Sequence, residues 1–397
     1  MKPMPETMRA LVYDRAQDPW ESTRGLRQVE VARATLDERA DYHDRSQVLV
    51  RPRFVGFCGS DRGIWFRRAF KDMIFGSLDR EAKQARSPRD RRIIGHELFG
   101  EVTAVGSDAR RTHGLEVGDL VSAESHVYCG VCHQCRSGDA HVCADDAIIG
   151  ISRDGAFAEL VKLPAQVVWR TDTSRIRPEV AALQEPFGNA VHACTKVNLR
   201  GKRVAIVGCG TIGLFAVAIA RALGARTIIG VEPVELHAAM ARKLGADVVL
   251  EPGAAKPGDY VHDPELVAEV RRLTDGVGVD VALEMSGLNS AVNNAIHCVR
   301  RGGDVILFGL KSGDAVIESF DRVIVDGIAM HSVIGRRVWE TWHITRHLLE
   351  SREPNIHDLI YEVILNRGDG TIVDFESFDP ALFEQRIQTF PKVVLRF

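Results

Sequence analysis

The sequence predicts an α/β protein with two parts, a β-rich domain and a doubly wound parallel sheet. Residues 47–57 and 97–105 mix β-branched and aromatic residues in short alternations, which is typical of strands. From residue 201 onward, short apolar strands alternate with helices, which is the pattern of βαβ units and a parallel sheet. The chain has 397 residues, enough for two domains of ordinary size.

The expected elements of the second part follow one another along the chain. In order, they are the strand RVAIVG, the helix TIGLFAVAIARALG, the strand TIIGVE, the helix PVELHAAMARKLG, the strands ADVVL and VDVALEMSG, the helix NSAVNNAIHCVR and the strand GGDVILFGL. The last third returns to a helix at WETWHITRHLLES and ends in the strand KVVLRF. We expect one domain over residues 1–186 and 336–397 and the other over 187–335.

The composition excludes several classes of protein. Apolar residues make up 45% and charged residues 26%, as in ordinary globular proteins. A net charge of −3 gives no general attraction to nucleic acid or anionic membranes. The sequence contains no run of about 18 apolar residues, the length that would predict a membrane span. The first residues lack the apolar run of a signal peptide, so we expect a cytoplasmic protein without nucleic-acid or membrane partners.

A glycine-rich turn predicts a dinucleotide site. The motif GCGTIG supplies Gly208, Gly210 and Gly213 between a strand and a helix, where glycines let the backbone approach a pyrophosphate. Glu232 ends the next strand, where a carboxylate accepts hydrogen bonds from ribose hydroxyls and favours NAD over NADP. His237 could lie near a 2′-phosphate, so NADP stays open. The alternative is a structural turn without a ligand.

Four closely spaced cysteines predict a metal site. Cys129, Cys132, Cys135 and Cys143 have the spacing C-x2-C-x2-C-x7-C. Four thiolates close a tetrahedron around Zn²⁺ and leave no place for water, which is typical of a structural zinc. An iron–sulfur cluster is the competing interpretation.

A second set of metal-ligand residue types is scattered along the chain. Cys58 stands in CGSD, His96 and Glu97 in GHE, and Glu185 in EPFGN. Taken singly, each has an ordinary explanation: a core cysteine, a turn histidine and solvated carboxylates.

The joint order of these motifs resembles the zinc-dependent medium-chain dehydrogenases. GFCGSD, GHE, the cysteine group, EPFGNAVHA and GCGTIG occur in that family's order over nearly the whole chain. The resemblance implies a GroES-like β-rich catalytic domain and a Rossmann cofactor domain. It implies that Cys58, His96 and Glu97 bind a catalytic zinc, with Glu185 as a fourth ligand or a neighbour that exchanges with water. It also implies that Ser60 relays the proton of the alcohol.

Such a site has a clear chemical use. Three protein ligands leave Zn²⁺ one open position, at which it polarises a substrate hydroxyl. Hydride then passes to the nicotinamide. We therefore expect one catalytic and one structural zinc per chain, with NAD as the cofactor and a small-molecule alcohol as the substrate.

Several stretches resemble the L-threonine 3-dehydrogenases in particular. They are EPFGNAVHA at 185–193, LEMSG at 283–287 and IGRRVWETW at 334–342. This resemblance implies oxidation of the 3-hydroxyl of a hydroxy amino acid, and a homo-oligomer, a tetramer before a dimer. It also implies further cofactor contacts at Ile212, Gly309, Leu310, Val333 and Ile334.

The sequence departs from that subfamily in three places. Arg62 and Gly63 stand where the threonine and sorbitol enzymes have a hydrophobic residue and a relay histidine. Residues 62–92 form an unusually long segment with ten Lys/Arg and four Asp/Glu. This segment is either a solvated helix or subunit contact, or a lid for an anionic substrate. His237 replaces a usual arginine near the ribose.

These departures keep two alternatives in view. The first is a polyol or sugar dehydrogenase of the sorbitol or glucose type, which could act on an anionic substrate. The second is a zinc-lobe binding protein without enzymatic activity. That alternative explains Cys129 to Cys143, but it leaves Cys58, His96 and the glycine motif without a role, and the chain lacks the basic charge of a nucleic-acid binder.

Overall fold

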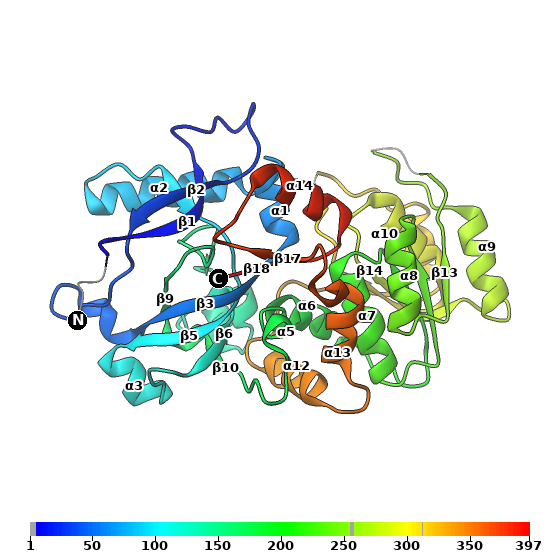
Figure 1. Cartoon of the computed structure of the whole chain (residues 1–397). Coiled ribbons are helices and arrows are strands. Elements are labelled where there is room, and N and C mark those ends of the chain that lie inside the picture. The colour runs from blue at the N-terminus through cyan, green and yellow to red at the C-terminus, as the bar shows by residue number, and fades with distance from the viewer. Residues whose placement is uncertain (1–4, 255–257, 312) are drawn as a thin grey trace. The chain divides into compact units, whose positions relative to one another are not determined.

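The structure is a computed structural model that describes residues 5–254, 258–311 and 313–397 (Figure 1). The chain divides into two compact units. Unit 1 consists of Met1–Pro186 and Leu365–Phe397, and unit 2 consists of Phe187–Ile364. Residues 336–364, which we expected with the first domain, belong to unit 2 in this division. The functional domain boundaries stay a prediction.

Unit 1 is built around a seven-stranded sheet. Its strands are β10 (Val168–Arg170), β6 (Leu120–Ala123), β5 (Glu97–Val105), β3 (Gln47–Phe57), β18 (Val393–Arg396) and β17 (Ile372–Asp374) in that order, with β9 (Val161–Pro164) also paired to β3. A three-stranded sheet adds β1 (Thr7–Asp14), β2 (Arg27–Ala32) and β4 (Arg91–Ile93). The C-terminal strand β18 runs antiparallel to β3, so both ends of the sequence contribute to one unit (Figure 1).

The central strand β3 shows how the sequence shapes this sheet. Buried Val50 and Pro52 alternate with exposed Arg51 and Arg53, as period-two patterning requires. Pro52 cannot donate a ladder hydrogen bond, and the pairing with β5 shifts register between Pro52 and Phe54. Both β3 and β5 cover the ranges expected from sequence. The pairing of β3 with β5 therefore sets the position of Phe57, the last residue of β3, and of the residues that follow it.

Helices surround the sheets of unit 1. They are α1 (Gly59–Trp65), α2 (Lys71–Ala85), α3 (Ser107–His113), α4 (His133–Arg136), α5 (Pro178–Ala181) and α14 (Pro380–Thr389). The core beneath them is aromatic, because Phe57 stacks on Phe157 and meets Trp65 and Phe383 edge-on.

Unit 2 is the doubly wound parallel sheet that the sequence predicts. Its six strands lie in the order β13 (Val248–Leu250), β12 (Thr227–Val231), β11 (Arg203–Val207), β14 (Val279–Glu284), β15 (Val299–Leu307) and β16 (Ala329–Ser332). Every pairing in this sheet is parallel.

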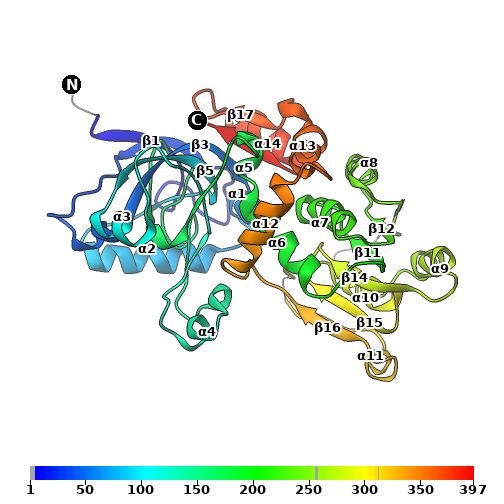
Figure 2. The ribbon, with the colours of Figure 1, turned by 90° about the horizontal axis from the view of Figure 1, so that it is seen from below.

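Helices cover both faces of this sheet. The pair α7 (Thr211–Ala222) and α8 (Glu235–Leu244) packs on one face, and α9 (Pro264–Leu273) and α10 (Asn289–Cys298) pack on the other (Figure 2). Unit 2 also contains α11 (Phe320–Val325), α12 (Glu340–Glu350) and α13 (Ile356–Leu359). The helix α6 (Gln184–Thr195) begins in unit 1 and continues in unit 2. We expected no element at α9 or α11 from the sequence.

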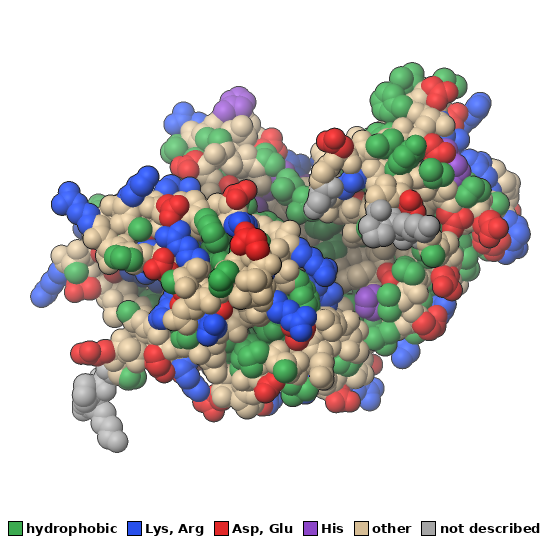
Figure 3. All heavy atoms as spheres, turned by 90° about the horizontal axis from the view of Figure 1, so that it is seen from above, with side chains coloured by type: hydrophobic (Ala, Val, Ile, Leu, Met, Phe, Trp, Pro, Cys, Tyr) green, Lys and Arg blue, Asp and Glu red, His purple; other side chains and the backbone are tan. Residues whose placement is uncertain are grey.

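Charged side chains of both signs are interspersed on the face seen in Figure 3, without a large patch of one sign. This distribution agrees with the small net charge. Across the described ranges, the helices are all too short or too polar to cross a membrane.

Candidate functional site

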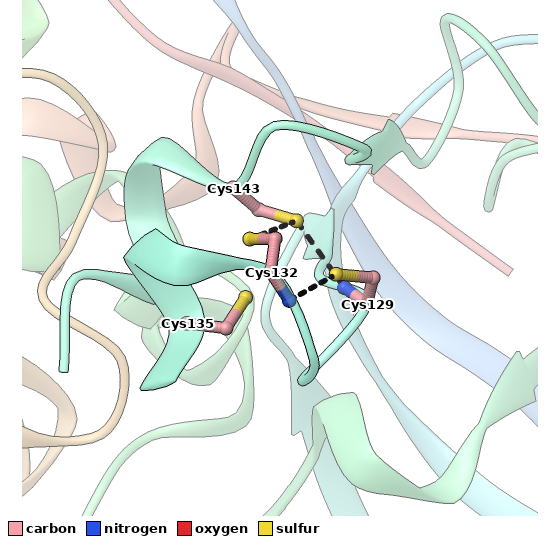
Figure 4. A group of neighbouring side chains, drawn as sticks. All are labelled: Cys129, Cys132, Cys135 and Cys143. Carbon is pink, nitrogen blue, oxygen red and sulfur yellow. Dashed lines mark hydrogen bonds between the residues drawn. The ribbon is translucent and has the colours of Figure 1, made fainter. Parts of the chain in front are cut away.

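The four cysteines of the predicted structural zinc site meet in a lobe of unit 1, which we call the cysteine lobe (residues 126–148). Its framework is the short pair β7 (His126–Val127) and β8 (Ala147–Ile148), with α4 between them. The Sγ atoms of Cys129, Cys132, Cys135 and Cys143 all lie within 4.8 Å of one another (Figure 4). None of the four forms a disulfide. The donor set therefore fits a tetrahedral Zn²⁺.

Backbone amides of the cysteine lobe prepare the thiols for a metal. The amides of Cys132 and Val131 donate to Cys129 Sγ at 3.3 and 3.5 Å. The amides of Cys129 and Asp145 donate to Cys143 Sγ at 3.3 and 3.4 Å. Backbone hydrogen bonds from Cys135 and Ala144 lower the pKa of Cys132 to about 6. Amides that stabilise thiolates favour the form that binds zinc.

The predicted catalytic ligand Cys58 lies at the first turn of α1. It follows β3 directly, and its amide donates to Asp61 Oδ2 at 2.9 Å. An acceptor side chain three residues into a helix satisfies a free amide at the helix start. This hydrogen bond fixes the chain so that Cys58 and Ser60 share the first turn.

His96 is buried beside these residues. Its Nε2 lies 3.3 Å from Ser60 Oγ, and its Nδ1 lies 3.6 Å from Asp61 Oδ1. Burial alone would lower the pKa of His96, but the charges of Asp61 and Cys58 raise it well above its usual value. Burial raises the pKa of Asp61 to about 6, against the pull of His96. The carboxylate of Asp61 thus faces the Nδ1 side of the ring beyond hydrogen-bond distance.

Glu97 occupies a different environment from the one expected of a free ligand. Lys392 Nζ contacts Glu97 Oε1 at 2.7 Å and Oε2 at 2.8 Å, and it also donates to the carbonyl of Phe57 at 3.0 Å. Glu97 is 0% and Lys392 2% exposed. A Cβ on Gly56 would lie 1.9 Å from Glu97 Oε2, so the buried pair needs glycine there. Glu97 would have to leave Lys392 to bind a metal.

The structure brings only part of the predicted catalytic set together. Glu185 is 3% exposed, and its charge raises the pKa of His96, so it lies near that ring. Within the described ranges, two groups of three or more ligand side chains gather to within 4.8 Å. These are the cysteine lobe and His262, His297 and Glu318. The set of Cys58, His96, Glu97 and Glu185 does not, and its ligand role stays a prediction.

Two residues of this region were missed by sequence reasoning. Asp61 had a local signal, because it stands three residues after Cys58 in CGSD at the start of a helix. Lys392 had none, because it is 295 residues from Glu97.

In unit 2 the glycine motif forms a tight strand-to-helix turn. Gly208 has φ +94°, and a Cβ there would lie 2.8 Å from Ser286 Cβ. A Cβ on Gly213 would lie 2.0 Å from the carbonyl oxygen of Gly208. Gly210 precedes α7 and borders open space. Two glycines are therefore needed for close packing, and the third faces the space at the helix start.

Glu232 lies directly after β12, as expected. Its Oε2 accepts from the Cys209 amide at 2.8 Å, and its Oε1 accepts from the Val234 amide at 3.0 Å. His237 Nδ1 lies 3.7 Å from Oε1. Burial would raise the pKa of Glu232, but His237 and the two amides hold it below the usual value. Glu232 is thus an anion at neutral pH, next to the glycine turn.

The remaining predicted cofactor residues differ in exposure. Ile212 is half-buried in α7 and Val333 is buried. Leu310 is 80% and Ile334 47% exposed. A Cβ on Gly309 would lie 2.1 Å from the amide nitrogen of Gly287, so the close approach of these two backbone segments needs glycine at 309. Their contact with a cofactor stays a prediction.

A further carboxylate near the glycine turn was missed. Glu284 ends β14, is 0% exposed, and accepts from the amides of Ser286 and Gly287 at 2.7 and 2.8 Å. Burial raises the pKa of Glu284. The motif LEMSG, at the end of a buried strand, was the available signal.

Two of the stretches that resemble threonine dehydrogenases contact each other in unit 2. Arg336 Nη1 donates to Asn189 Oδ1 at 2.8 Å, and His192 Nδ1 lies 3.0 Å from the carbonyl of Gly335. A Cβ on Gly188 would lie 2.8 Å from Arg336 Cδ. EPFGNAVHA and IGRRVWETW therefore form one packed structural element.

The basic segment 62–92 folds into α1, α2 and β4. Many of its cations pair with carboxylates: Lys71 with Glu21, Arg89 with Glu81 and Asp154, Arg91 with Asp14, and Arg92 with Glu81 and Asp154. Most of these pairs join α2, β4 and the loop between them to the rest of unit 1, and the Arg92 side chain is fully buried. Arg62 differs, because it is half-buried and lies 3.5 Å from the carbonyl of Phe390.

Comparisons with known proteins agree with this arrangement. The family model described as "Alcohol dehydrogenase GroES-like domain" matches residues 44–173, and the one described as "Zinc-binding dehydrogenase" matches 211–351. The L-threonine 3-dehydrogenase of Pyrococcus furiosus is 41% identical over 314 residues, which cover 79% of this chain and 83% of that protein. The enzyme of the same name from Symbiobacterium thermophilum is 36% identical over 345 residues, 87% of each chain.

Solved structures show the same fold at lower identity. An alcohol dehydrogenase from Thermotoga maritima has a TM-score of 0.78 at 22% identity and covers 98% of this chain and 99% of that one. Galactitol-1-phosphate dehydrogenase from Escherichia coli has a TM-score of 0.75 at 24% identity and covers 98% and 100%. The predicted combination of a GroES-like domain and a Rossmann domain is confirmed. The chain belongs to the zinc-binding medium-chain alcohol dehydrogenase family and is an alcohol dehydrogenase enzyme.

Proposed function

We propose that this enzyme oxidises a secondary alcohol with NAD, using a zinc held by Cys58 and His96, and that L-threonine is its leading substrate. The observation that carries the proposal is the group formed by the half-buried Cys58 and Ser60 and the buried His96 in unit 1. The relatives named L-threonine 3-dehydrogenase support the substrate.

The donor chemistry of this group fits a catalytic zinc. Asp61 lies on the Nδ1 side of His96, which leaves Nε2, on the side of Ser60, as the metal-binding nitrogen. Cys58 supplies the thiolate. The carboxylate comes from Glu185, or from Glu97 if it leaves Lys392. A bound zinc would polarise the substrate hydroxyl and lower its pKa.

The protein's own groups would handle the proton. Ser60 is the first acceptor, as its position after Cys58 implies. No side chain at Gly63 can continue the relay, and a Cβ there would lie 3.0 Å from Ala69 Cβ. The packing at Ala69 thus disfavours a histidine at position 63. Water next to Ser60 would then carry the proton onward.

NAD is favoured over NADP by the charge at the end of β12. The carboxylate of Glu232 stays ionised and lies beside the amides that follow Gly208, where an adenosine ribose would bind. A 2′-phosphate would be repelled there. His237 Nδ1 lies 3.7 Å from the same carboxylate, so this imidazole is turned toward Glu232.

A polyol or sugar, including a phosphorylated sugar, is the second candidate substrate. The observation in its favour is Gly63: the relay histidine of the threonine and sorbitol enzymes is absent, which favours a sugar over both threonine and a sorbitol-type polyol. The contact between EPFGNAVHA and IGRRVWETW gives a second reason. Because these two stretches pack on each other, their similarity to the threonine enzymes is explained by packing as well as by a shared substrate.

One assay separates these candidates. NADH formation is measured with L-threonine, sorbitol, glucose and a sugar phosphate at equal concentrations. We expect turnover of L-threonine above the others. Turnover of a polyol without turnover of threonine would contradict the leading substrate while leaving the dehydrogenase function intact.

The zinc count and the assembly are tested on the same preparation. We expect about two zinc ions per chain by elemental analysis, one in each predicted site, and a value near one would remove the catalytic site. We also expect a homotetramer, as the resemblance implies, and a mass of one chain by light scattering would contradict it.

A further inference from the structure

Three ligand-type side chains meet in unit 2, away from the glycine turn and the predicted zinc sites. His262 precedes α9, His297 lies in the last turn of α10, and Glu318 lies shortly before α11. All three are half-buried. Each offers a nitrogen or oxygen atom within 4.8 Å of the other two. Three segments that are far apart in sequence therefore share one cluster of donors, which we call the His–His–Glu cluster.

The contacts inside the His–His–Glu cluster leave a donor atom available. His262 Nδ1 lies 2.7 Å from Glu318 Oε2, and the His262 amide donates to the same oxygen at 2.9 Å. The rings of His262 and His297 stack with centroids 3.8 Å apart and planes inclined by 4°. Nε2 of His297 is buried and has no hydrogen-bond partner within the described residues. A buried polar atom without a partner is costly unless something binds it.

Asparagines of α10 hold the two other segments in place. The Asp263 amide donates to Asn294 Oδ1 at 2.7 Å, and the Glu318 amide donates to Asn293 Oδ1 at 2.9 Å. Asn293 Nδ2 also donates to the carbonyl of Tyr260 at 2.6 Å. These bonds fix the backbone on either side of His262 and at Glu318. The donors are thus positioned by a rigid helix and not by a free loop.

Charged groups of both signs lie around the cluster. Arg322 pairs with Asp326 at 3.0 Å and donates to the carbonyl of Val299 at 3.0 Å. Arg271 donates to the carbonyl of His297 at 3.4 Å. Glu318 supplies the anionic oxygen.

We propose that His262, His297 and Glu318 form a Zn²⁺-type site in unit 2, separate from the two zinc sites of the proposed function. Two imidazoles and a carboxylate are a common zinc donor set that leaves one position for water. Imidazole ligands also accept Ni²⁺ and Co²⁺.

Metal binding requires one local change. An imidazole binds a metal in its own plane, so the two parallel rings cannot both face one ion. His262, which lies outside the helix, would turn about its side-chain bonds, and the proton shared between His262 and Glu318 would be released. The bound ion would then link the segment before α9, the end of α10 and the segment before α11. It would stabilise unit 2 without entering the reaction.

The test uses the full-length protein, saturated with Zn²⁺ and passed through a desalting column. Zinc per chain is compared between wild type, His297→Gln and His347→Gln. His347 is an exposed histidine of α12 in the same unit, so it controls for surface binding. Zinc-saturated wild type should hold about three zinc ions per chain, one more than the two expected of protein isolated without added zinc. His297→Gln should hold one fewer than saturated wild type, and His347→Gln should equal it. Added Zn²⁺ should raise the melting temperature of wild type but not of His297→Gln.

Equal zinc content in wild type and His297→Gln would overturn the proposal, and so would an equal loss in His347→Gln. A second variant, His262→Phe, keeps an aromatic ring on His297 while removing the donor, and it should lose the same zinc. This keeps the test decisive if His297→Gln folds poorly. Because the readout is zinc content and melting temperature, failure here leaves the dehydrogenase proposal untouched.

Discussion

The cysteine lobe and the region around Cys58 and His96 are the two proposed metal sites of one unit, and they are built in opposite ways. In the lobe, all ligands come from fifteen consecutive residues, and the amides of the same segment donate to their sulfurs. Around His96, the partners come from β3, α1, β5, α6 and β18, and Asp61 and Lys392 fix their charges. The lobe is organised by its local backbone, whereas the second site depends on the packing of the whole unit.

The largest expected effect comes from removing a ligand of the second site. Cys58→Ser should abolish hydride transfer, because the metal loses its thiolate. NADH binding, measured by fluorescence titration, should stay near the wild-type value, since the glycine turn lies in unit 2. Turnover at the wild-type rate would show that Cys58 is not a metal ligand. The cysteine lobe would then be the one proposed metal site of unit 1 that remains.

Next in size is the loss of Lys392. Lys392→Met leaves Glu97 as a buried charge without its partner, which costs about 3–5 kcal/mol of unfolding free energy. Urea denaturation measures this change. The double variant Lys392→Met/Glu97→Gln should recover most of the loss, because no charge stays unpaired. If Lys392→Met is instead as stable as wild type when loaded with zinc, Glu97 binds the metal and the ion pair is dispensable.

Asp61→Asn should have an intermediate effect. Loss of a carboxylate that orients a histidine ligand lowers metal affinity by about 10–100-fold. Zinc competition with a chromophoric chelator measures this shift at the catalytic site. Asp139→Asn, in the cysteine lobe outside its ligand set, is the matched control and should leave both affinities unchanged. An unchanged affinity in Asp61→Asn would mean that His96 is oriented by packing alone.

The smallest change is a difference in rate between the two sites. A mild chelator should remove the zinc of the second site first, since that site keeps an open position and the cysteine lobe is closed by four thiolates. Activity should fall to zero while about one zinc per chain remains and the far-ultraviolet circular dichroism is unchanged. Simultaneous loss of both ions would erase the distinction between the sites.

The same contrast explains what the sequence could predict. The cysteine lobe was predictable because its spacing is local, and β3 and β5 were predictable because alternation within one strand is local. The parallel sheet followed from the order of strands and helices. Lys392 was not predictable, because nothing near KVVLRF indicates that β18 pairs with β3 and brings the lysine to Glu97.

Chain-wide pairing limited the other predictions too. The division into compact units places residues 336–364 in unit 2, where Arg336 contacts the distant Gly188 and Asn189, and the functional domain boundaries stay a prediction. The His–His–Glu cluster escaped notice because 35 residues separate His262 from His297, with no motif spacing. Asp61 was within reach, since its position in CGSD is that of a helix-start acceptor.

The contact between Gly188 and Arg336 has a consequence for protein engineering. Any larger residue at 188 would collide with the arginine side chain, and a shorter residue at 336 would leave Asn189 without its donor. Exchange of either stretch alone with a relative that lacks this glycine and arginine would therefore produce a mismatched chimera. Segment grafting or recombination libraries for new substrates should keep EPFGNAVHA and IGRRVWETW together as a single inherited block.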